Sequence, residues 1–306
     1  MHTTKPHSAA LPLPHILLAL AVALVWGSNF VVIKLGLAQL PPLLFAALRF
    51  ALAAVPLVLF LPRPPVPWRN LAAYGLAIGL GTFGLLFLAM NRHISPGLAS
   101  LVIQAQVFFT IGLVIWQTGE RPPAFQMAAM ILAAAGMGLI IARTEGDTTA
   151  LGVALVLLAA LSWALGNLVG RAAGPVNALA YVAWSSLFAV PPLLGLSLWL
   201  EGAPRIAAAL AEADAAAWAA VLWQSLGNTV FGYGAWAWLL ARHPAASITP
   251  FALLVPLSGM GASALLLGET LPGWKLAAAA LVLAGLALNV LCPRLSAGRQ
   301  NGANSA

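Results

Sequence analysis

The chain has 306 residues, of which 62% are hydrophobic and only 7% are charged, whereas a soluble domain carries roughly 25% charged residues. This composition excludes an ordinary soluble domain and predicts an integral membrane protein. The net charge of +7 comes from single basic residues between apolar runs, which excludes a nucleic-acid partner and favours contact with the lipid bilayer. One cysteine, Cys292, excludes an internal disulfide, and because no His/Cys cluster has metal-ligand spacing, we expect neither a metal nor another cofactor.

The apolar segments predict the fold class. They are about 20 residues long, the length an α-helix needs to cross the hydrocarbon core, whereas membrane strands would alternate in polarity over about 10 residues. The fold is therefore predicted to be all-α. Proline, glycine and charged residues separate ten predicted spans, near residues 15–36, 43–61, 70–90, 96–117, 124–142, 151–172, 178–200, 216–240, 245–267 and 273–292.

The two halves of the chain resemble each other. FGLLFLAMNRHISP (83–96) aligns with YGAWAWLLARHP (233–244), and GERP (119–122) corresponds to GETLP (268–272). This pattern predicts two five-helix repeats, residues 15–145 and 146–292. Because five is odd, the second copy must cross the membrane in the opposite orientation, and such inverted repeats are typical of secondary transporters.

Lysine and arginine in the connections predict the orientation, because cytoplasmic loops carry more of them. Residues 1–14 form the N-terminal tail, and the apolar run that follows is expected to be a retained first helix rather than a signal peptide, because it reaches spanning length. With this tail inside, the cytoplasmic side has Lys5, Arg63, Arg69, Arg121, Arg171, Arg242, Arg294 and Arg299, and the outer side has Lys34, Arg92, Arg143, Arg205 and Lys275. Both termini, including the C-terminal tail 293–306, are therefore predicted to be cytoplasmic.

Several segments, in their order along the chain, resemble the EamA family of the drug/metabolite transporter superfamily, and within it the bacterial exporters of O-acetylserine and cysteine. The resemblance implies a ten-helix protein of the inner membrane that exports amino acids or related metabolites. The segments that carry it are WGSNFVVIKLGL (26–37), PPLLFAALRF (41–50), SPGLASLVIQAQVFFT (95–110), LSWALGN (161–167), GYGAWAWLLARH (232–243) and FALLVPLSGMGASALLLGETL (251–271).

Arg49 is a permanent charge inside the second apolar segment, roughly 9 Å below its outer end. A guanidinium keeps its charge at any biological pH, so it needs solvent, a partner or a ligand. Three interpretations remain open. Arg49 snorkels to the membrane surface, it binds backbone carbonyls, or it faces a cavity and binds a substrate carboxylate through two hydrogen bonds.

Other polar and aromatic side chains at membrane depth are candidates for the substrate site: Asn29, Gln104, Gln106, Trp163, Asn167, Gln224 and Asn228. For the amides, the alternative is a hydrogen bond between helices, worth about 0.6 kcal/mol on average in membranes. Gln104 and Gln106 are about 200° apart on a regular helix, so we expect only one of them to face a cavity and the other to bind a neighbouring helix.

Four residues are structural candidates. Pro250 and Pro256 each remove a backbone donor from the ninth span, whereas the fourth span has no matching prolines. Glu120 and Glu269 lie in the two equivalent GE turns, where we expect them to bind facing helix ends. No carboxylate lies at mid-depth in the sequence, which disfavours proton coupling through a buried acid.

We therefore predict a secondary transporter that exports a small-molecule substrate such as cysteine or O-acetylserine. Other cargo, such as aromatic amino acids or lipophilic drugs, is the alternative, and a cavity richer in aromatic side chains than in amides would favour it. An intramembrane enzyme would need H-E-x-x-H, a positioned Ser/His pair or paired Asp at depth, and none is present. Short loops disfavour a scaffold.

Overall fold

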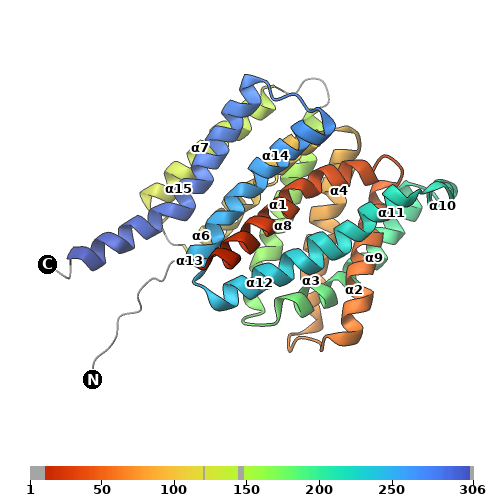
Figure 1. Ribbon diagram of the computed structural model, residues 1–306, viewed down its shortest axis with the longest axis horizontal. Coiled ribbons are helices and arrows are strands. Elements are labelled where there is room, and N and C mark those ends of the chain that lie inside the picture. Colours follow the sequence, from red (N-terminus) through yellow and green to blue (C-terminus); the bar gives the residue numbers. More distant parts are fainter. Residues whose placement is uncertain (1–10, 120, 144–147, 304–306) are drawn as a thin grey trace.

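The helices of the computed structural model run roughly side by side in one bundle (Figure 1), and the structure describes residues 11–119, 121–143 and 148–303. Within these ranges every regular element is helical. The first half contains α1 (Leu13–Gly36), α2 (Pro42–Phe60), α3 (Trp68–Gly75), η1 (Leu76–Gly84), α4 (Leu85–Arg92), α5 (Pro96–Val102), α6 (Ala105–Thr118) and α7 (Ala124–Ile141). The second half contains α8 (Ala150–Ala172), α9 (Ala178–Leu200), α10 (Ala203–Glu212), α11 (Ala215–Leu222), η2 (Trp223–Phe231), α12 (Gly232–Arg242), α13 (Ala245–Ile248), η3 (Thr249–Leu253), α14 (Leu254–Leu267) and α15 (Gly273–Ala303).

The described residues form 9 helices that are long and apolar enough to cross a membrane, or up to 10 when α10 and the helix Ala215–Arg242 are counted together as one span. The two helices of this pair meet at a bend of 103°. The sequence analysis did not predict the short helix α10. α15 continues past the predicted end at residue 292, but its apolar part, Gly273–Cys292, ends there. The prediction of an all-α membrane protein is confirmed.

Local sequence explains where several spans begin and end. α2 and α5 start at Pro42 and Pro96, at positions where the missing backbone N–H would have no partner in the helix. α6 and α14 end at Gly119 and Gly268, whose φ angles are 68° and 67°. Glycine adopts this left-handed conformation without a steric penalty and commonly ends helices in this way. The two equivalent GE turns therefore end equivalent helices.

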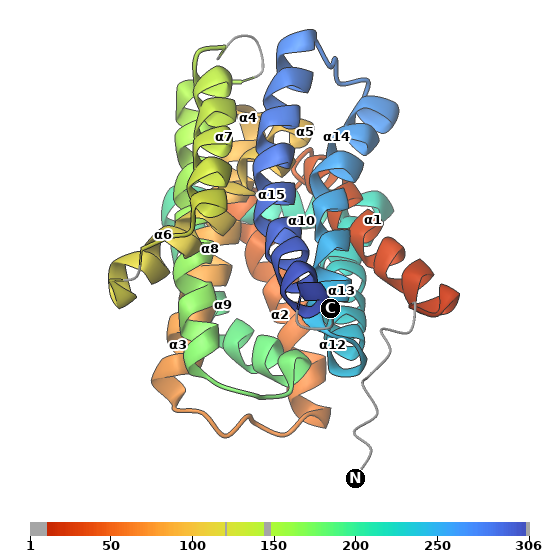
Figure 2. The same cartoon turned by 90° about the vertical axis from the view of Figure 1, so that its left-hand side faces the viewer.

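Helix pairing follows the repeat. Extensive contacts join α2 to α9, α7 to α15, α1 to α14 and α6 to α8. In terms of spans, the second packs on the seventh, the fifth on the tenth, the first on the ninth and the fourth on the sixth. Exchange of the two halves leaves this pattern unchanged. Figures 1 and 2 place α7 and α15 together at one edge of the bundle.

The third and eighth spans share a widened turn. η1 and η2 are π-helical segments, and each contains a threonine whose hydroxyl donates to the carbonyl five residues earlier. Thr82 Oγ1 lies 3.1 Å from Ala77 O, and Thr229 Oγ1 lies 3.0 Å from Gln224 O. π-Helical turns are rare and frequent at functional sites, so their presence at equivalent places draws attention to this level of the bundle.

The fourth and ninth spans are interrupted near their starts. Between α5 and α6, Gln104 N bonds Leu101 O at 3.2 Å and Gln106 N bonds Ile103 O at 3.1 Å, which is the tighter pattern of a 3₁₀ turn. In the ninth span the 3₁₀ segment η3 contains Pro250, and Pro256 lies in the first turn of α14. The fourth span is thus broken without a proline, a feature that the sequence analysis did not predict.

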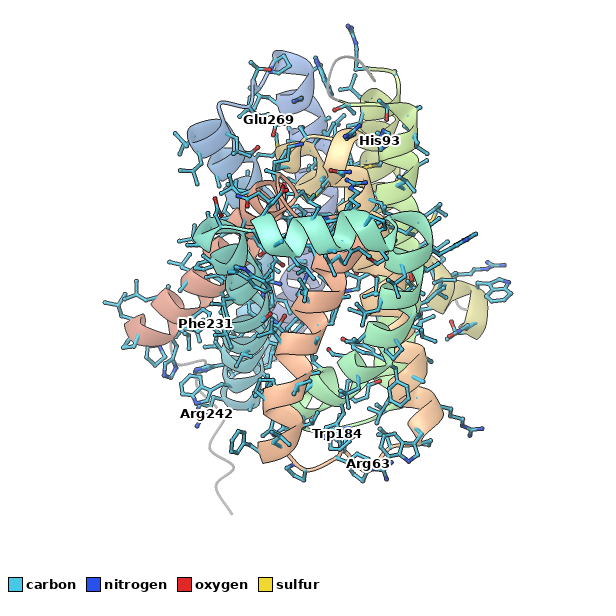
Figure 3. The ribbon with its side chains drawn as sticks, turned by 90° about the vertical axis from the view of Figure 1, so that its right-hand side faces the viewer. Arg63, His93, Trp184, Phe231, Arg242 and Glu269 are labelled. Carbon is cyan, nitrogen blue, oxygen red and sulfur yellow. The ribbon has the colours of Figure 1, made fainter. Side chains whose placement is uncertain are left out.

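The two ends of the bundle are distinguished by the residues that lie there. Figure 3 shows Glu269 and His93 at one end, the Glu269 end, and Arg63, Trp184 and Arg242 at the other, the Arg242 end.

Candidate functional site

A cavity of about 160 Å³ lies where these irregular segments meet. We call it the central cavity. Irregular backbone at membrane depth is tolerated where it is buried in protein or lines such a cavity, and broken helices at corresponding places of two repeats point to a binding site. Its lining residues are Trp26, Asn29, Phe30, Ile33, Phe83, Leu86, Ile103, Gln104, Gln106, Trp163, Asn228, Tyr233, Ala252 and Val255.

Five of the predicted site residues line the central cavity: Asn29, Gln104, Gln106, Trp163 and Asn228. They come from α1, the α5–α6 break, α6, α8 and η2. Both halves of the chain therefore contribute to one cavity. No described residue that lines it carries a charge.

The expectation that Gln104 and Gln106 cannot face the same cavity is wrong. It assumed a regular helix, whereas the turn between α5 and α6 breaks the helix at this point, and both side chains line the cavity. Gln106 also binds a neighbouring helix, because its Oε1 accepts a hydrogen bond from Asn167 Nδ2 at 2.9 Å.

Asn167 and Gln224 lie behind the cavity wall and hold the amides that form it. Asn167 Nδ2 also donates to Thr110 Oγ1 at 3.1 Å. Gln224 is fully buried and its Nε2 donates to Asn29 Oδ1 at 2.7 Å. Each of the two amide pairs therefore joins a residue of the first half to one of the second half, which restricts the side chain that faces the cavity.

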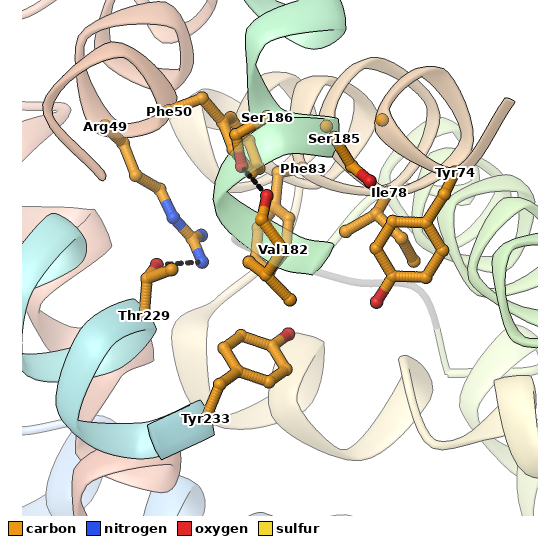
Figure 4. A pocket seen from close by; sticks show the side chains of 12 residues that line it. Arg49, Phe50, Tyr74, Ile78, Phe83, Val182, Ser185, Ser186, Thr229 and Tyr233 are labelled. Atoms are coloured by element: carbon orange, nitrogen blue, oxygen red, sulfur yellow. Dashed lines mark hydrogen bonds between the residues drawn. The ribbon is translucent and has the colours of Figure 1, made fainter. Parts of the chain in front are cut away.

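Arg49 lies in a second, smaller compartment. Arg49 is 1% exposed, and the surrounding compartment has a volume of about 10 Å³, which is room for about one water molecule. Figure 4 shows the guanidinium directed toward Thr229, whereas Ser185 lies across the compartment beside Tyr74. We call it the Arg49 compartment, and its lining residues are Arg49, Phe50, Tyr74, Gly75, Ile78, Gly79, Phe83, Val182, Ser185, Ser186, Thr229 and Tyr233.

The snorkelling interpretation of Arg49 is wrong, because the side chain is buried. Its Nη2 donates to Thr229 Oγ1 at a long 3.5 Å, and the guanidinium carbon lies 3.6 Å from the centroid of the Phe83 ring. Nε and Nη1 have no hydrogen-bond partner. The interpretation as a bridge to backbone carbonyls therefore also finds no support. A buried donor without a partner costs about 1–3 kcal/mol, and the ring face offsets only part of this cost.

Phe83 and Tyr233 line both compartments. On one side the Phe83 ring faces the guanidinium, and its centroid lies 6.2 Å from that of Trp163. These two aromatic residues, which the sequence analysis did not single out, form the partition between Arg49 and the central cavity. Phe83 lies in one π-helical segment and Tyr233 lies just after the other, and these positions could have indicated their role. Hydrophobic periodicity, however, does not reveal π-helical turns.

Aromatic side chains make up a large part of the central cavity. Trp26 Nε1 donates to Asn228 O at 3.2 Å, which fixes the indole against η2, and the ring packs at 5.6 Å from that of Tyr233. The cavity has five aromatic residues, Trp26, Phe30, Phe83, Trp163 and Tyr233, beside four amides, Asn29, Gln104, Gln106 and Asn228.

Glu269 ties helix ends together outside the membrane-spanning segments. It accepts hydrogen bonds from Gly97 N at 2.9 Å, from the hydroxyls of Ser95 and Ser263, and from Lys275 Nζ at 2.9 Å. Burial alone would raise the pKa of its carboxyl, but the hydrogen bonds, led by the one from Lys275, outweigh burial and lower the pKa. Glu120, its counterpart in the first repeat, lies outside the described residues.

A second carboxylate, Glu201, performs a similar task at the same end. Its two oxygens accept from Leu43 N at 2.7 Å and Leu44 N at 3.1 Å, at the start of α2, and Ser197 Oγ donates to it at 2.6 Å. Negative charge at a helix N-terminus is favourable. The sequence analysis did not single out Glu201.

A bundle of membrane-spanning helices, interrupted at equivalent places of two halves around a polar and aromatic cavity, defines a secondary transporter. The chain belongs to the EamA-like transporter family, whose family model matches residues 13–142 and 150–291. The two matches cover the two halves of the bundle.

Individual relatives cover most of this chain. It is 44% identical over 279 residues to a Salmonella typhimurium protein described as a probable amino-acid metabolite efflux pump, with 89% of this chain and 93% of the relative covered. An Escherichia coli protein with the same description is 41% identical over the same shares. A probable terminal-alkyne amino-acid exporter of Streptantibioticus cattleyicolor is 29% identical over 92% of this chain and 93% of the relative.

A solved structure supports the fold. Its description says only that it is the crystal structure of a protein, and it superimposes with a TM-score of 0.62 at 19% identity, covering 92% of this chain and 98% of that one.

Proposed function

We propose that this protein exports small amino acids or related metabolites, with cysteine and O-acetylserine as the best candidates, across the inner membrane by alternating access. The observation that carries the proposal is the central cavity, in which both halves of the chain present amides beside aromatic faces. Amides offer donors and acceptors to a zwitterion, and aromatic faces attract an ammonium group. The descriptions of the two relatives at 44% and 41% identity agree with this cargo class.

The proposed orientation places the Glu269 end outside and both termini in the cytoplasm, because the Arg242 end carries more of the loop lysines and arginines. In this orientation the structure corresponds to an inward-facing state. Every residue of α5 is buried at the Glu269 end, where α5 packs along α14. At the Arg242 end, η3 has no fully buried residue, and α6 makes no comparable contact with α13 or η3 among the described residues; Figure 2 separates α6 from α13.

Export then needs the contact between α5 and α14 to open while α6 approaches η3. Ala252 of η3 lines the central cavity, so cargo is proposed to enter from the cytoplasm beside η3. The lining of both compartments, as the structure describes them, contains no carboxylate and no histidine. We therefore propose efflux down the gradient of cargo, without a proton carried by a buried acid.

The test is efflux of labelled cysteine and O-acetylserine from preloaded proteoliposomes, with and without a pH gradient. We expect the parent protein to release both at a rate that the gradient does not change. Gln104→Ala should lower the rate, whereas the matched control Gln117→Ala, exposed on α6, should not. Release no faster than from protein-free liposomes would refute the proposed cargo.

The aromatic lining favours a second candidate cargo, aromatic amino acids or lipophilic drugs, because aromatic residues outnumber amides by five to four. The same liposomes distinguish the two. If this candidate is right, tryptophan or a lipophilic cation such as ethidium should compete with labelled cysteine more strongly than serine does. Trp163→Leu should then weaken the competition by tryptophan more than that by serine.

A further inference from the structure

The Arg49 compartment holds polar groups that the protein itself leaves unpaired. Nε and Nη1 of Arg49 and Oγ of Ser185 are buried and have no hydrogen-bond partner. They line the same compartment, although they come from α2 and α9, the helices that pair across the two repeats. Buried polar groups in native proteins are almost always paired, so three unpaired groups around one compartment point to a ligand.

The charge in this compartment has no counterpart. Arg49 is the one charged residue among those that line either compartment, and the single ion pair found in the described part of the chain joins Glu269 to Lys275. Each of the two bidentate edges of a guanidinium includes a nitrogen that is unpaired here. A planar group with one negative charge matches this fork, and a carboxylate is such a group.

We propose that the Arg49 compartment is a carboxylate site, in which the cargo carboxylate binds the Arg49 guanidinium and the Ser185 hydroxyl donates a hydrogen bond to the cargo, while the rest of the cargo occupies the central cavity. The inference rests on the proposed function and narrows its cargo to molecules that carry a carboxylate. Phe83 and Tyr233, which line both compartments, must move apart to admit the carboxylate, because the Arg49 compartment has room for only about one water molecule.

The contact between Phe83 and Arg49 explains how the site can select a carboxylate over other groups. The Phe83 ring lies against the guanidinium at 3.6 Å, so an approaching group must interact with Arg49 strongly enough to replace this contact. A carboxylate does so through charge-assisted hydrogen bonds. An uncharged amide or ester of the same size does not, and a cationic amine is repelled. The site therefore selects amino acids against their esters and against the corresponding amines.

The experiment measures inhibition of labelled O-acetylserine efflux in proteoliposomes by serine, serine methyl ester and ethanolamine. For the parent we expect serine to inhibit and the other two to need concentrations about 10-fold to 100-fold higher, the equivalent of one charge-assisted hydrogen bond or pair. Arg49→Lys keeps the charge but loses the fork, so the serine concentration for half inhibition should rise about 10-fold or more. Ser185→Ala should raise it about 2-fold to 10-fold.

Two control variants remove the same chemical groups elsewhere. Arg205→Lys changes an exposed arginine of α10, and Ser28→Ala removes a hydroxyl that already donates to Leu24 O of its own helix at 2.7 Å. Both should behave like the parent. Thermal unfolding in detergent, with acetate or acetamide as ligands, provides a measurement that does not depend on transport. Acetate should raise the unfolding temperature of the parent more than acetamide, and Arg49→Gln should abolish the difference.

The outcomes separate the two proposals. Efflux in which serine and its methyl ester inhibit equally, or in which Arg49→Lys and Ser185→Ala match the parent, overturns the carboxylate site and leaves the exporter standing. Absence of any amino-acid efflux overturns the proposed function, and the acetate experiment then decides the site: equal shifts with acetate and acetamide overturn it, and an Arg49-dependent shift supports it.

Discussion

The two ends of the bundle are held together by different chemistry. At the Glu269 end, Glu269 and Glu201 accept hydrogen bonds from the backbone N–H groups that start α5 and α2. At the Arg242 end the corresponding ties are between neutral groups, such as the Tyr181 hydroxyl and Asn70 Oδ1 at 2.7 Å and the indole of Trp184 and Leu61 O at 3.0 Å. Charge-assisted hydrogen bonds are roughly twice as strong as neutral ones. The comparison teaches that the closed end of the bundle is also the end with the stronger ties.

The same difference appears in the packing of the interrupted helices. α5 is buried throughout, whereas η3 has no fully buried residue. In a transporter built from inverted repeats, α5 corresponds to α13 together with η3, so a symmetric bundle would bury the two regions more equally. In the second region Ile248 of α13 is buried but no residue of η3 is. The unequal burial of the two regions describes a molecule that is closed at one end.

The largest expected effect is on the Glu269 tie. Glu269→Ala removes the carboxylate and leaves the ammonium of Lys275, a side chain that is only 10% exposed, without its ion-pair partner. Breaking a buried pair on one side costs about 3–5 kcal/mol. We expect the thermal unfolding temperature in detergent to fall sharply, while Glu212→Ala, on an exposed residue of α10, changes it little. An unchanged unfolding temperature for Glu269→Ala would contradict the strength assigned to this tie.

The next largest effect is expected from a methyl group added where α5 and α14 are in contact. A Cβ added at Gly259 would lie 2.5 Å from Ser100 Oγ, closer than the packing tolerates, and overpacking of this kind costs about 1–3 kcal/mol. Gly259→Ala should therefore weaken the closed Glu269 end and alter the efflux rate. Gly261→Ala, on the same helix, adds a methyl group with no atom within 4 Å and should resemble the parent. Equal behaviour of the two variants would argue against close packing at this contact.

A smaller effect is expected at the opposite end. Asn70 accepts from Tyr181 and donates through Nδ2 to Val169 O at 3.0 Å. Because both hydrogen bonds are neutral, Asn70→Ala should cost about 1–2 kcal/mol. Its destabilisation in thermal unfolding should be smaller than that of Glu269→Ala, and a larger one would reverse the ranking of the two ends.

The smallest effect near neutrality is that of pH. The pKa of Glu269 lies below its ordinary value of 4.5, so the folded protein holds this carboxylate ionised more readily than the unfolded chain does. The stability it contributes is fully present above about pH 5 and is lost as the pH falls through the lowered pKa. Thermal unfolding should show a stability component that is constant from pH 8 to pH 5, decreases below this range, and is missing in Glu269→Gln. A component lost between pH 8 and pH 6 would be inconsistent with a lowered pKa.

Much of the architecture could be predicted from the sequence because apolar length and the internal repeat determine it. The same reasoning failed where backbone geometry departs from a regular helix. Gln104 and Gln106 were predicted to point apart because no proline or glycine marks the turn at Ile103. The π-helical turns at Thr82 and Thr229 likewise leave no recognisable pattern in the sequence.

The site was only partly predictable for a related reason. Depth along a span identified the amides and Arg49, because polar groups inside a membrane are few. Depth does not reveal which neighbours a side chain meets, so the separation of Arg49 from the central cavity by Phe83 and Tyr233, and the unpaired Ser185, needed the packing of α2, α9 and α12.

The most direct test of the account labels a cysteine placed beside the proposed cytoplasmic entrance. Ala252→Cys, in a Cys292→Ser background, is treated with a membrane-impermeant maleimide in inside-out and right-side-out vesicles, with and without O-acetylserine. The account predicts labelling from the cytoplasmic face and slower labelling when O-acetylserine is present. Labelling from the outer face alone, or a rate that O-acetylserine does not change, would contradict an inward-facing cargo cavity at this position.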